Sequence, residues 1–249
     1  YQRALAISEK ALGPDHQQTA DSINGLGLVY VSTDEFGKAG RLLQQALEIT
    51  ERTLGAEHSR VVSCLIYLGR LRIKLGDLAQ AERDLQRALA ISDKALEPDE
   101  LLKAKVLNNL ANLYVNKKDY ERAEPLAQHS LRIKEKFLVP DHPDIAYPLL
   151  NLGWIARQQK DYSRALDMYR RALVIHERAL GPEHIDVAAL LNNIANVYKS
   201  KRDYVQPLEL YQRVLKIAEK AGGPYHGLTL VALGNMANLY MARGDVANA

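Results

Sequence analysis

One tripeptide pattern recurs along the chain at whole multiples of 42 residues, always in the same register. The six copies are Pro14-Asp15-His16, Ala56-Glu57-His58, Pro98-Asp99-Glu100, Pro140-Asp141-His142, Pro182-Glu183-His184 and Pro224-Tyr225-His226. A period this long, without insertion or deletion, indicates stacked copies of one supersecondary unit rather than a single globular core. We therefore expect the 249 residues to form a solenoid in which each unit contacts only its neighbours.

Each period divides into two helices. In the first helix, apolar residues fall at i, i+3, i+4 and i+7, as in Leu107, Leu110, Ala111 and Tyr114. A second helix is expected to begin at an aspartate, whose carboxylate can accept free N–H groups of the first turn. These aspartates recur in register at Asp77, Asp119, Asp161, Asp203 and Asp245. The second helix ends at the tripeptide turn, after which a proline such as Pro143 suits the first position of the next helix.

The spacing predicts an all-α fold with a single array over residues 1–249. Five full helix pairs are expected at about 18–54, 60–96, 102–138, 144–180 and 186–221, with half-repeats at 1–12 and 228–249. Repeat arrays need polar capping units to cover their end faces. Neither end of the sequence shows such a unit, so we expect a piece of a longer protein.

Composition narrows the class of protein. The 33 Lys and Arg outnumber the 30 Asp and Glu by too little to indicate a nucleic-acid partner. Cys64 is the only cysteine, so neither a disulfide framework nor a thiolate metal cluster can form. No apolar run approaches the length of about 18 residues that a membrane span needs. We therefore expect a soluble, cytoplasmic protein with no membrane partner.

Small residues recur where paired helices must approach each other closely. The sets are Gly27, Ala39 and Ala46; Ala111, Ala123 and Ser130; and Ala195, Pro207 and Val214. This spacing resembles that of tetratricopeptide repeats over the whole chain. The 42-residue period and the strings LNNLANLY and LNNIANVY are similar to the kinesin light chain type of repeat. The resemblance implies a right-handed superhelical solenoid of antiparallel helix pairs, with the first helices lining the concave face.

The first helices carry asparagine, lysine and arginine side chains opposite their apolar stripe. The resemblance implies that this side faces the concave surface of the solenoid. Asparagine has both donors and an acceptor, so a row of asparagines can hold the main chain of a peptide. Lys and Arg among them would attract an acidic peptide or a C-terminal carboxylate. The predicted peptide-binding groove contains Asn24, Arg70, Lys105, Asn108, Asn109, Asn112, Tyr147, Asn151, Trp154, Arg157, Asn192, Asn193, Asn196, Lys199, Asn235 and Asn238. Two alternatives stay open: the amides bond to one another or to neighbouring helices, and bases near the turns answer the helix dipole.

Trp154 is the sole tryptophan and falls where Asn112 and Asn196 stand in other repeats. With Tyr147 and Leu150 it would form an apolar pocket for one hydrophobic anchor of the ligand. The alternative is that Trp154 fills a wide junction between helices.

The histidines do not indicate a metal site. Metal ligands converge to about 2 Å from one ion, whereas equivalent residues of adjacent helix pairs lie about 10 Å apart. The recurrent histidines are therefore turn residues, and we interpret His129 and His176 as surface residues. Cys64 and His58 lie on different sides of one helix, which favours a buried thiol over a nucleophile. Without a phosphate-binding glycine loop, paired catalytic carboxylates or a serine elbow, we expect no enzyme activity, no catalytic or metal-binding residue and no cofactor.

Two classes of function remain. The first is a protein–protein interaction scaffold whose groove binds a short acidic linear segment of a partner, as the resemblance to kinesin light chain implies for cargo peptides. The second is the regulatory or sensor arm of a larger multidomain protein with a covalently linked effector domain. It is raised because GNMANLYMARGDVANA is similar to the last repeat before the caspase-like CHAT protease domain of bacterial tetratricopeptide proteins. RNA binding is disfavoured because it needs aromatic side chains between the Lys and Arg residues, on which nucleobases can stack. Only Trp154 and Tyr147 offer such rings here.

Overall fold

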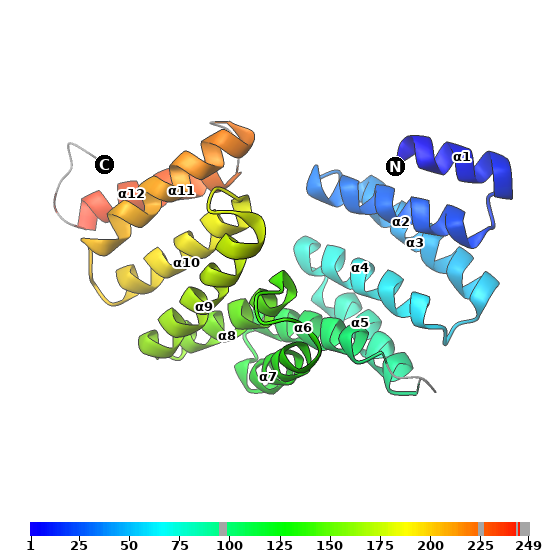
Figure 1. Ribbon diagram of the computed structural model, residues 1–249, viewed down its shortest axis with the longest axis horizontal. Coiled ribbons are helices and arrows are strands. Elements are labelled where there is room, and N and C mark those ends of the chain that lie inside the picture. The colour runs from blue at the N-terminus through cyan, green and yellow to red at the C-terminus, as the bar shows by residue number, and fades with distance from the viewer. Residues whose placement is uncertain (95–98, 224–226, 243, 245–249) are drawn as a thin grey trace. The chain divides into compact units, whose positions relative to one another are not determined.

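The computed structural model describes residues 1–94, 99–223, 227–242 and 244. Every regular element within these ranges is a helix (Figure 1). Some residues to which the sequence assigned turn or cap positions lie outside the described residues, namely Pro98, Pro224, Tyr225, His226 and Asp245.

The helices gather in two compact units, Tyr1–Ile133 (unit 1) and Lys134–Ala249 (unit 2). Unit 1 contains α1 (Gln2–Leu12), α2 (Gln17–Ser32), α3 (Phe36–Leu54), α4 (Ser59–Leu75), α5 (Leu78–Lys94), α6 (Glu100–Asn116) and most of α7 (Tyr120–Phe137). Unit 2 contains the short 3-10 turn η1 (Pro143–Ile145), α8 (Ala146–Gln158), α9 (Tyr162–Leu180), α10 (Ile185–Ser200), α11 (Gln206–Gly222) and α12 (Gly227–Ala242). By the 42-residue register, the first helices of the repeats are α2, α4, α6, α8, α10 and α12, and the others are second helices.

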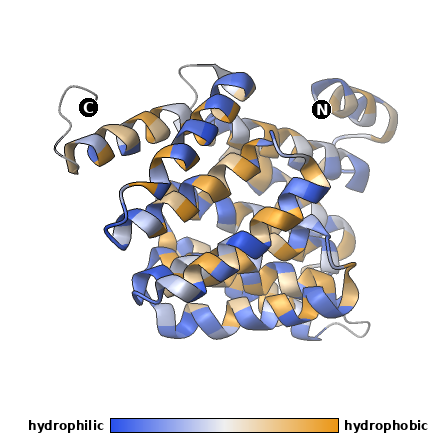
Figure 2. Ribbon diagram, turned by 60° about the vertical axis from the view of Figure 1, so that its left-hand side comes forward, coloured by the Kyte–Doolittle hydropathy of each residue, from blue (hydrophilic) through white to orange (hydrophobic). Residues whose placement is uncertain are grey.

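Helices that are adjacent in sequence pack as pairs. In unit 1, α2 packs on α3 and α4 on α5, and in unit 2, α8 packs on α9 and α10 on α11. Ala20 and Ile23 of α2 meet Ala46 and Ile49 of α3 at the centre of their pair. The equivalent residues of α10 and α11 form a cluster in unit 2, namely Ala188, Leu191, Val214 and Ile217. Hydrophobic residues accordingly alternate with hydrophilic ones along the helices (Figure 2), and the predicted all-α fold of stacked helix pairs is confirmed.

Glycine lets the two helices of a pair approach each other at one position of the repeat. A Cβ added to Gly27 would lie 2.8 Å from Leu43 Cδ2, and one added to Gly69 would lie 2.8 Å from Leu85 Cγ. At Gly153 the added atom would lie 2.6 Å from Tyr169 Cε1. Real Cβ atoms do not come this close to another carbon, so the small residue is a packing requirement rather than a source of flexibility.

Aspartates start the second helices. The Oδ1 atoms of Asp77, Asp119 and Asp161 accept the backbone N–H three residues ahead, at 3.2, 3.2 and 3.1 Å. Asp203 Oδ1 accepts from the N–H groups of Val205 and Gln206 at 3.1 and 3.3 Å. The predicted capping role is therefore confirmed at Asp77, Asp119 and Asp161, where it satisfies N–H groups that the helix itself leaves unpaired. Asp203 instead bonds within the turn before α11, whose N-cap is Val205.

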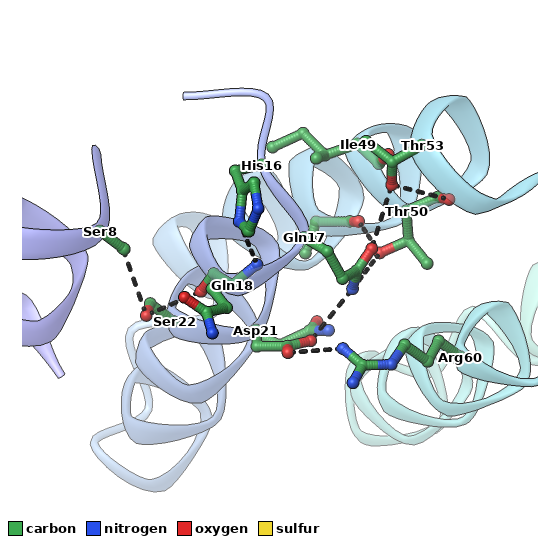
Figure 3. Close-up of polar contacts among 12 residues, drawn as sticks. Ser8, His16, Gln17, Gln18, Asp21, Ser22, Ile49, Thr50, Thr53 and Arg60 are labelled. Carbon is green, nitrogen blue, oxygen red and sulfur yellow. Dashed lines mark hydrogen bonds and ion pairs between the residues drawn. The ribbon is translucent and has the colours of Figure 1, made fainter. Parts of the chain in front are cut away.

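Histidines cap α2, α4 and α10 and the turn η1 that leads into α8, a role that was not predicted from the sequence. The Nδ1 atoms of His16, His58, His142 and His184 accept the N–H two residues ahead, at 3.2, 3.1, 3.1 and 3.2 Å. Figure 3 shows this bond between His16 and Gln18 at the start of α2. In the register where histidine is replaced by Glu100, the preceding Asp99 caps α6 instead, accepting from the N–H of Leu102 at 2.8 Å. The recurrent turn histidine is thus a helix N-cap.

His176 corrects one expectation of the sequence analysis. It was interpreted as a surface residue, but it is only 1% exposed. Its repeat position is also buried at Thr50, Lys134 and Ala218, which are at most 2% exposed. The polar residues at this position made the helix face look exposed, whereas the first helix of the following repeat covers it: Thr50, for example, lies 3.8 Å from Cys64 of α4.

Candidate functional site

In unit 1, Asn24 lies within a helix contact. Its Nδ2 donates to Cys64 Sγ at 3.2 Å, so it joins α2 to α4. The side chain is only 9% exposed, and its Oδ1 has no hydrogen-bond partner among the described residues. Burial raises the pKa of the Cys64 thiol, in agreement with the predicted buried and unreactive cysteine. Asn24 therefore contributes to packing between repeats rather than to an exposed surface.

The predicted groove residues of α4 and α6 reach solvent. Arg70 and Lys105 are exposed, while Asn108, Asn109 and Asn112 are partly exposed. Asn109 Nδ2 donates to the Lys105 carbonyl of the preceding turn at 2.7 Å. The carbonyl of Asn112 accepts from Asn116 Nδ2 at 2.8 Å. Because α4 and α6 pack on each other, unit 1 places these bases and amides on neighbouring first helices.

In unit 2, α8 carries the two predicted aromatic residues, and both are solvent-exposed. Tyr147 is 44% exposed and meets the His176 ring edge-on, with the ring centres 6.1 Å apart. Trp154 is 36% exposed, and the guanidinium carbon of Arg157 lies 4.6 Å from its ring centre. Asn151 between them is buried. Trp154 and Arg157 form a cation–π contact, so an exposed indole ring and a positive charge lie side by side on the surface.

The amides of α10 and α12 are partly bonded to one another. Asn235 Nδ2 donates to Asn192 Oδ1 at 3.0 Å, and Asn235 Oδ1 accepts from Lys199 Nζ at 3.2 Å. Asn196 Oδ1 accepts from the hydroxyl of the buried Tyr211 at 2.8 Å. These three asparagines therefore fit the alternative in which amides bridge helices. Asn193 is partly exposed and Asn238 is exposed.

Arg157 and Lys199 concentrate positive charge on this side of unit 2. Partial burial lowers the pKa of Lys199, and the positive charge of Arg157 lowers it further. Burial raises the pKa of Tyr211 to about 12, which Arg157 opposes. Within the ranges that the structure describes, Lys199 bonds to Asn235 and Arg157 stacks on Trp154, and neither pairs with a carboxylate. The positive charges of Arg157 and Lys199 therefore disfavour each other.

A hollow of about 520 Å³ between α3 and α4 of unit 1 was not predicted. Gly40 lines it, at the position where α5 and α7 carry Glu82 and Glu124. Arg72 also lines it and pairs with Asp84, whose pKa is raised by burial although Arg72 opposes this. The glycine in place of a long side chain was the signal in the sequence. None of the predicted groove residues lines this hollow.

Within the described ranges, no helix is both long and apolar enough to cross a membrane. The same residues contain no group of His, Cys, Asp and Glu side chains arranged to hold a metal ion.

Comparison with known proteins identifies the repeat. The sequence profile described as tetratricopeptide repeat matches residues 1–52, 24–94, 102–178 and 186–249. The comparison with curated proteins gave no match. The solved structure of BtubC (BKLC) from P. vanneervenii is similar, with a TM-score of 0.70 and 24% identity over 87% of this chain and 86% of that one.

Two further solved structures share the fold. The nearly identical TPR-like repeats of a Podosopora anserina protein described as a putative kinesin light chain give a TM-score of 0.60 and 22% identity over 83% of this chain and 98% of that one. A Signal Transduction ATPase with Numerous Domains (STAND) with a tetratricopeptide repeat sensor, from Pyrococcus horikoshii, gives a TM-score of 0.67. It is 18% identical over 95% of this chain and 35% of that one. The predicted resemblance to repeats of the kinesin light chain type is confirmed.

Proposed function

The chain belongs to the tetratricopeptide repeat family, whose repeats generally serve as protein–protein interaction scaffolds, and from this premise we propose that it binds a short acidic segment of a partner protein. The binding surface in unit 2 is the exposed side of α8, α10 and α12, which we call the unit 2 face. It carries Trp154, Arg157, Asn193, Lys199 and Asn238.

The observation that carries this proposal is the unmatched charge of Arg157 and Lys199. Each is partly buried, and neither pairs with a carboxylate in the described part of the chain. Removing cations from water is unfavourable unless opposite charge is supplied. A glutamate or aspartate side chain, or a C-terminal carboxylate, would supply it through charge-assisted hydrogen bonds. The face is therefore complementary to an acidic peptide.

The neighbouring side chains give such a peptide further contacts. Trp154 offers an exposed ring on which an apolar side chain of the ligand can rest. Asn193 and Asn238 reach solvent and can bond to a peptide main chain. Lys199 uses one described hydrogen bond, to Asn235, which fixes its direction and leaves other N–H donors of its ammonium group for a ligand. The bonded amides thus act as a support that positions the charged group.

Charge reversal tests the proposal. The probe is a fluorescein-labelled, glutamate-rich peptide with one central leucine, and its partner probe has glutamine at each glutamate. We expect the acidic peptide to bind more tightly in fluorescence anisotropy, and the Arg157→Glu, Lys199→Glu double variant to lose at least about tenfold in affinity. The matched control, Arg170→Glu with Lys216→Glu, makes the same charge change on the exposed sides of α9 and α11.

The control distinguishes site from overall charge. Equal losses in both double variants would mean that net charge alone attracts the peptide, and equal binding of the glutamine probe would remove the acidic preference. Either result contradicts the proposal. The loss at the face should also be larger at low salt than at high salt, because screening weakens interactions between exposed charges.

A second candidate function is a sensor arm within a larger multidomain protein, such as a caspase-like CHAT protease. It is supported by the STAND ATPase, whose tetratricopeptide repeats are described as a sensor and in which this fold occupies about a third of the chain. The two functions share one binding face. Sequencing of the full open reading frame separates them, because an α/β segment with a His and a Cys after Ala249 favours the protease and further repeats favour the adaptor.

A further inference from the structure

The hollow between α3 and α4 lies within unit 1, and another repeat fills the equivalent space with a leucine. In the α11–α12 pair, Leu208 packs against the cluster that contains Leu239. By the 42-residue register, the equivalents of these two residues are Gly40 and Leu71, and both line the hollow. A Cβ added to Gly40 would lie 3.6 Å from Leu71 Cδ2, which is an ordinary contact distance. The hollow therefore has room for a leucine side chain that α3 does not supply.

The wall that α4 contributes to the hollow is largely apolar. Leu68 and Leu71 line it and are each 2% exposed, whereas Leu75, which also lines it, is 53% exposed. Leu75 is apolar at a register position that is polar in the other repeats, which carry Thr33, Lys117, Gln159, Lys201 and Arg243. An exposed leucine beside buried leucines marks a place where a ligand can bury an apolar group.

The charges around the hollow balance, which favours an uncharged ligand. Its charged lining residues are two bases and two acids, namely Arg41, Arg72, Glu48 and Asp77. Arg72 already pairs with Asp84 of α5. Glu48 Oε1 accepts from Gln44 Nε2 at 3.1 Å. A charged group of a ligand would lose its water here without gaining an unmatched opposite charge, which is unfavourable.

We propose that this hollow binds a leucine side chain on an uncharged segment of a partner protein, in the space that Leu208 fills in the α11–α12 pair. The volume of about 520 Å³ exceeds that of one side chain, so the adjoining main chain of the segment can enter as well. Gln44 and Gln45 line the hollow and carry amide groups that can bond to that main chain. The inference goes beyond the proposed acidic-peptide surface, because no residue of the unit 2 face lines the hollow.

NMR of leucine methyl groups in the 249-residue chain tests the proposal. The probe is a capped pentapeptide of serine and glutamine with one central leucine. Its control probe has asparagine, which is similar in shape but polar, in place of that leucine. We expect the leucine probe to give saturable shifts of the Leu71 and Leu75 methyl signals and the asparagine probe to give none. Absence of saturable shifts with the leucine probe, or equal shifts with both probes, overturns the proposal.

Filling the hollow from within should remove the site. Gly40→Leu places on α3 the side chain that Leu208 supplies in α11, and it is expected to weaken binding of the leucine probe by at least about tenfold. The matched control Gly37→Leu makes the same change on α3 outside the hollow, where an added Cβ meets nothing within 4 Å. This control should bind the probe as the parent chain does. Parent-like binding by Gly40→Leu, or equal losses in both variants, contradicts the proposal.

A surface variant makes the test independent of helix packing. Leu75→Gln introduces the residue type of Gln159 at a position that is 53% exposed, so its melting temperature should match that of the parent chain. The leucine probe should bind about threefold more weakly or worse, because part of its apolar contact is lost. The Leu71 methyl signals report the affinity. A parent-like affinity in this variant would mean that the probe binds outside the hollow, which overturns the proposal.

Discussion

His176 is a buried titratable side chain whose charge state is coupled to the folding of unit 2. Both ring nitrogens are buried without a hydrogen-bond partner in the described residues. Burial lowers the pKa of the imidazole, and His184 lowers it further. The negative charge of Asp186 and the nearby Pro143 backbone raise this pKa in part, although the Pro143 backbone is not placed to form a hydrogen bond with the ring. Tyr147 and the ammonium of Lys134, which lies 5.5 Å from the Tyr147 ring centre, complete the surroundings.

The sign of the pH effect follows from this shift. The unfolded chain has a histidine pKa of about 6.5, and the folded value is lower. Between the two values the unfolded state binds more protons, so the free energy of unfolding falls as pH drops below about 6.5 and levels off below the folded pKa. The variant His176→Gln should remove this part of the pH dependence in urea unfolding. Variant His129→Gln in α7 serves as the control, and an unchanged pH slope in His176→Gln would contradict the assignment.

Gly153 tests the close approach of α8 and α9. An added Cβ would meet the Tyr169 ring at 2.6 Å, so Gly153→Ala should destabilise unit 2 by about 1–3 kcal/mol through overpacking. The matched change Gly234→Ala meets nothing within 4 Å in α12 and should be neutral or stabilising by up to about 1 kcal/mol, because alanine favours a helix. Chemical denaturation measures both. Equal effects would show that helix propensity, rather than contact with Tyr169, sets the cost.

Among the described residues, a side-chain acceptor stands at the start of α2, α4, α6 and α10 and of the turn η1 before α8, but the residue type varies. Four starts use a histidine Nδ1 atom, while α6 uses the carboxylate of Asp99. The sequence showed that these positions belong to turns, because they recur with prolines between two helical stripes. It did not show the capping role of histidine, which is not among the side chains most often found at an N-cap.

Removal of one histidine cap should therefore weaken one helix. His58→Ala is expected to lower the free energy of unfolding by about 1 kcal/mol, because the N–H of Arg60 loses its acceptor at the start of α4. His58→Asp, which restores an oxygen acceptor, should recover most of this loss. Thermal unfolding of the two variants at neutral pH makes the comparison. Equal destabilisation by alanine and aspartate would mean that the ring itself, and not its acceptor, stabilises the turn.

At the scale of the whole molecule, the repeat period was enough to predict stacked helix pairs, since every period carries the same apolar stripe and turn. The exposure of single polar residues was harder to predict. His176 is covered by another element, and the row of asparagines includes Asn24, which is buried against Cys64. Asn192 and Asn235 bond to each other. Whether a polar side chain is buried or exposed depends on how neighbouring repeats pack, and the sequence period of a single helix does not predict that packing.

Trp154 fluorescence provides a direct test of peptide binding at the unit 2 face. It is the only tryptophan in the chain, so its emission reports on one place within the unit 2 face. Titration of the unlabelled glutamate-rich peptide into the parent chain should give a saturable change in Trp154 emission, with the same midpoint as anisotropy and a weaker affinity at high salt. Binding that is seen by anisotropy while Trp154 emission stays constant would place the peptide elsewhere and contradict the account.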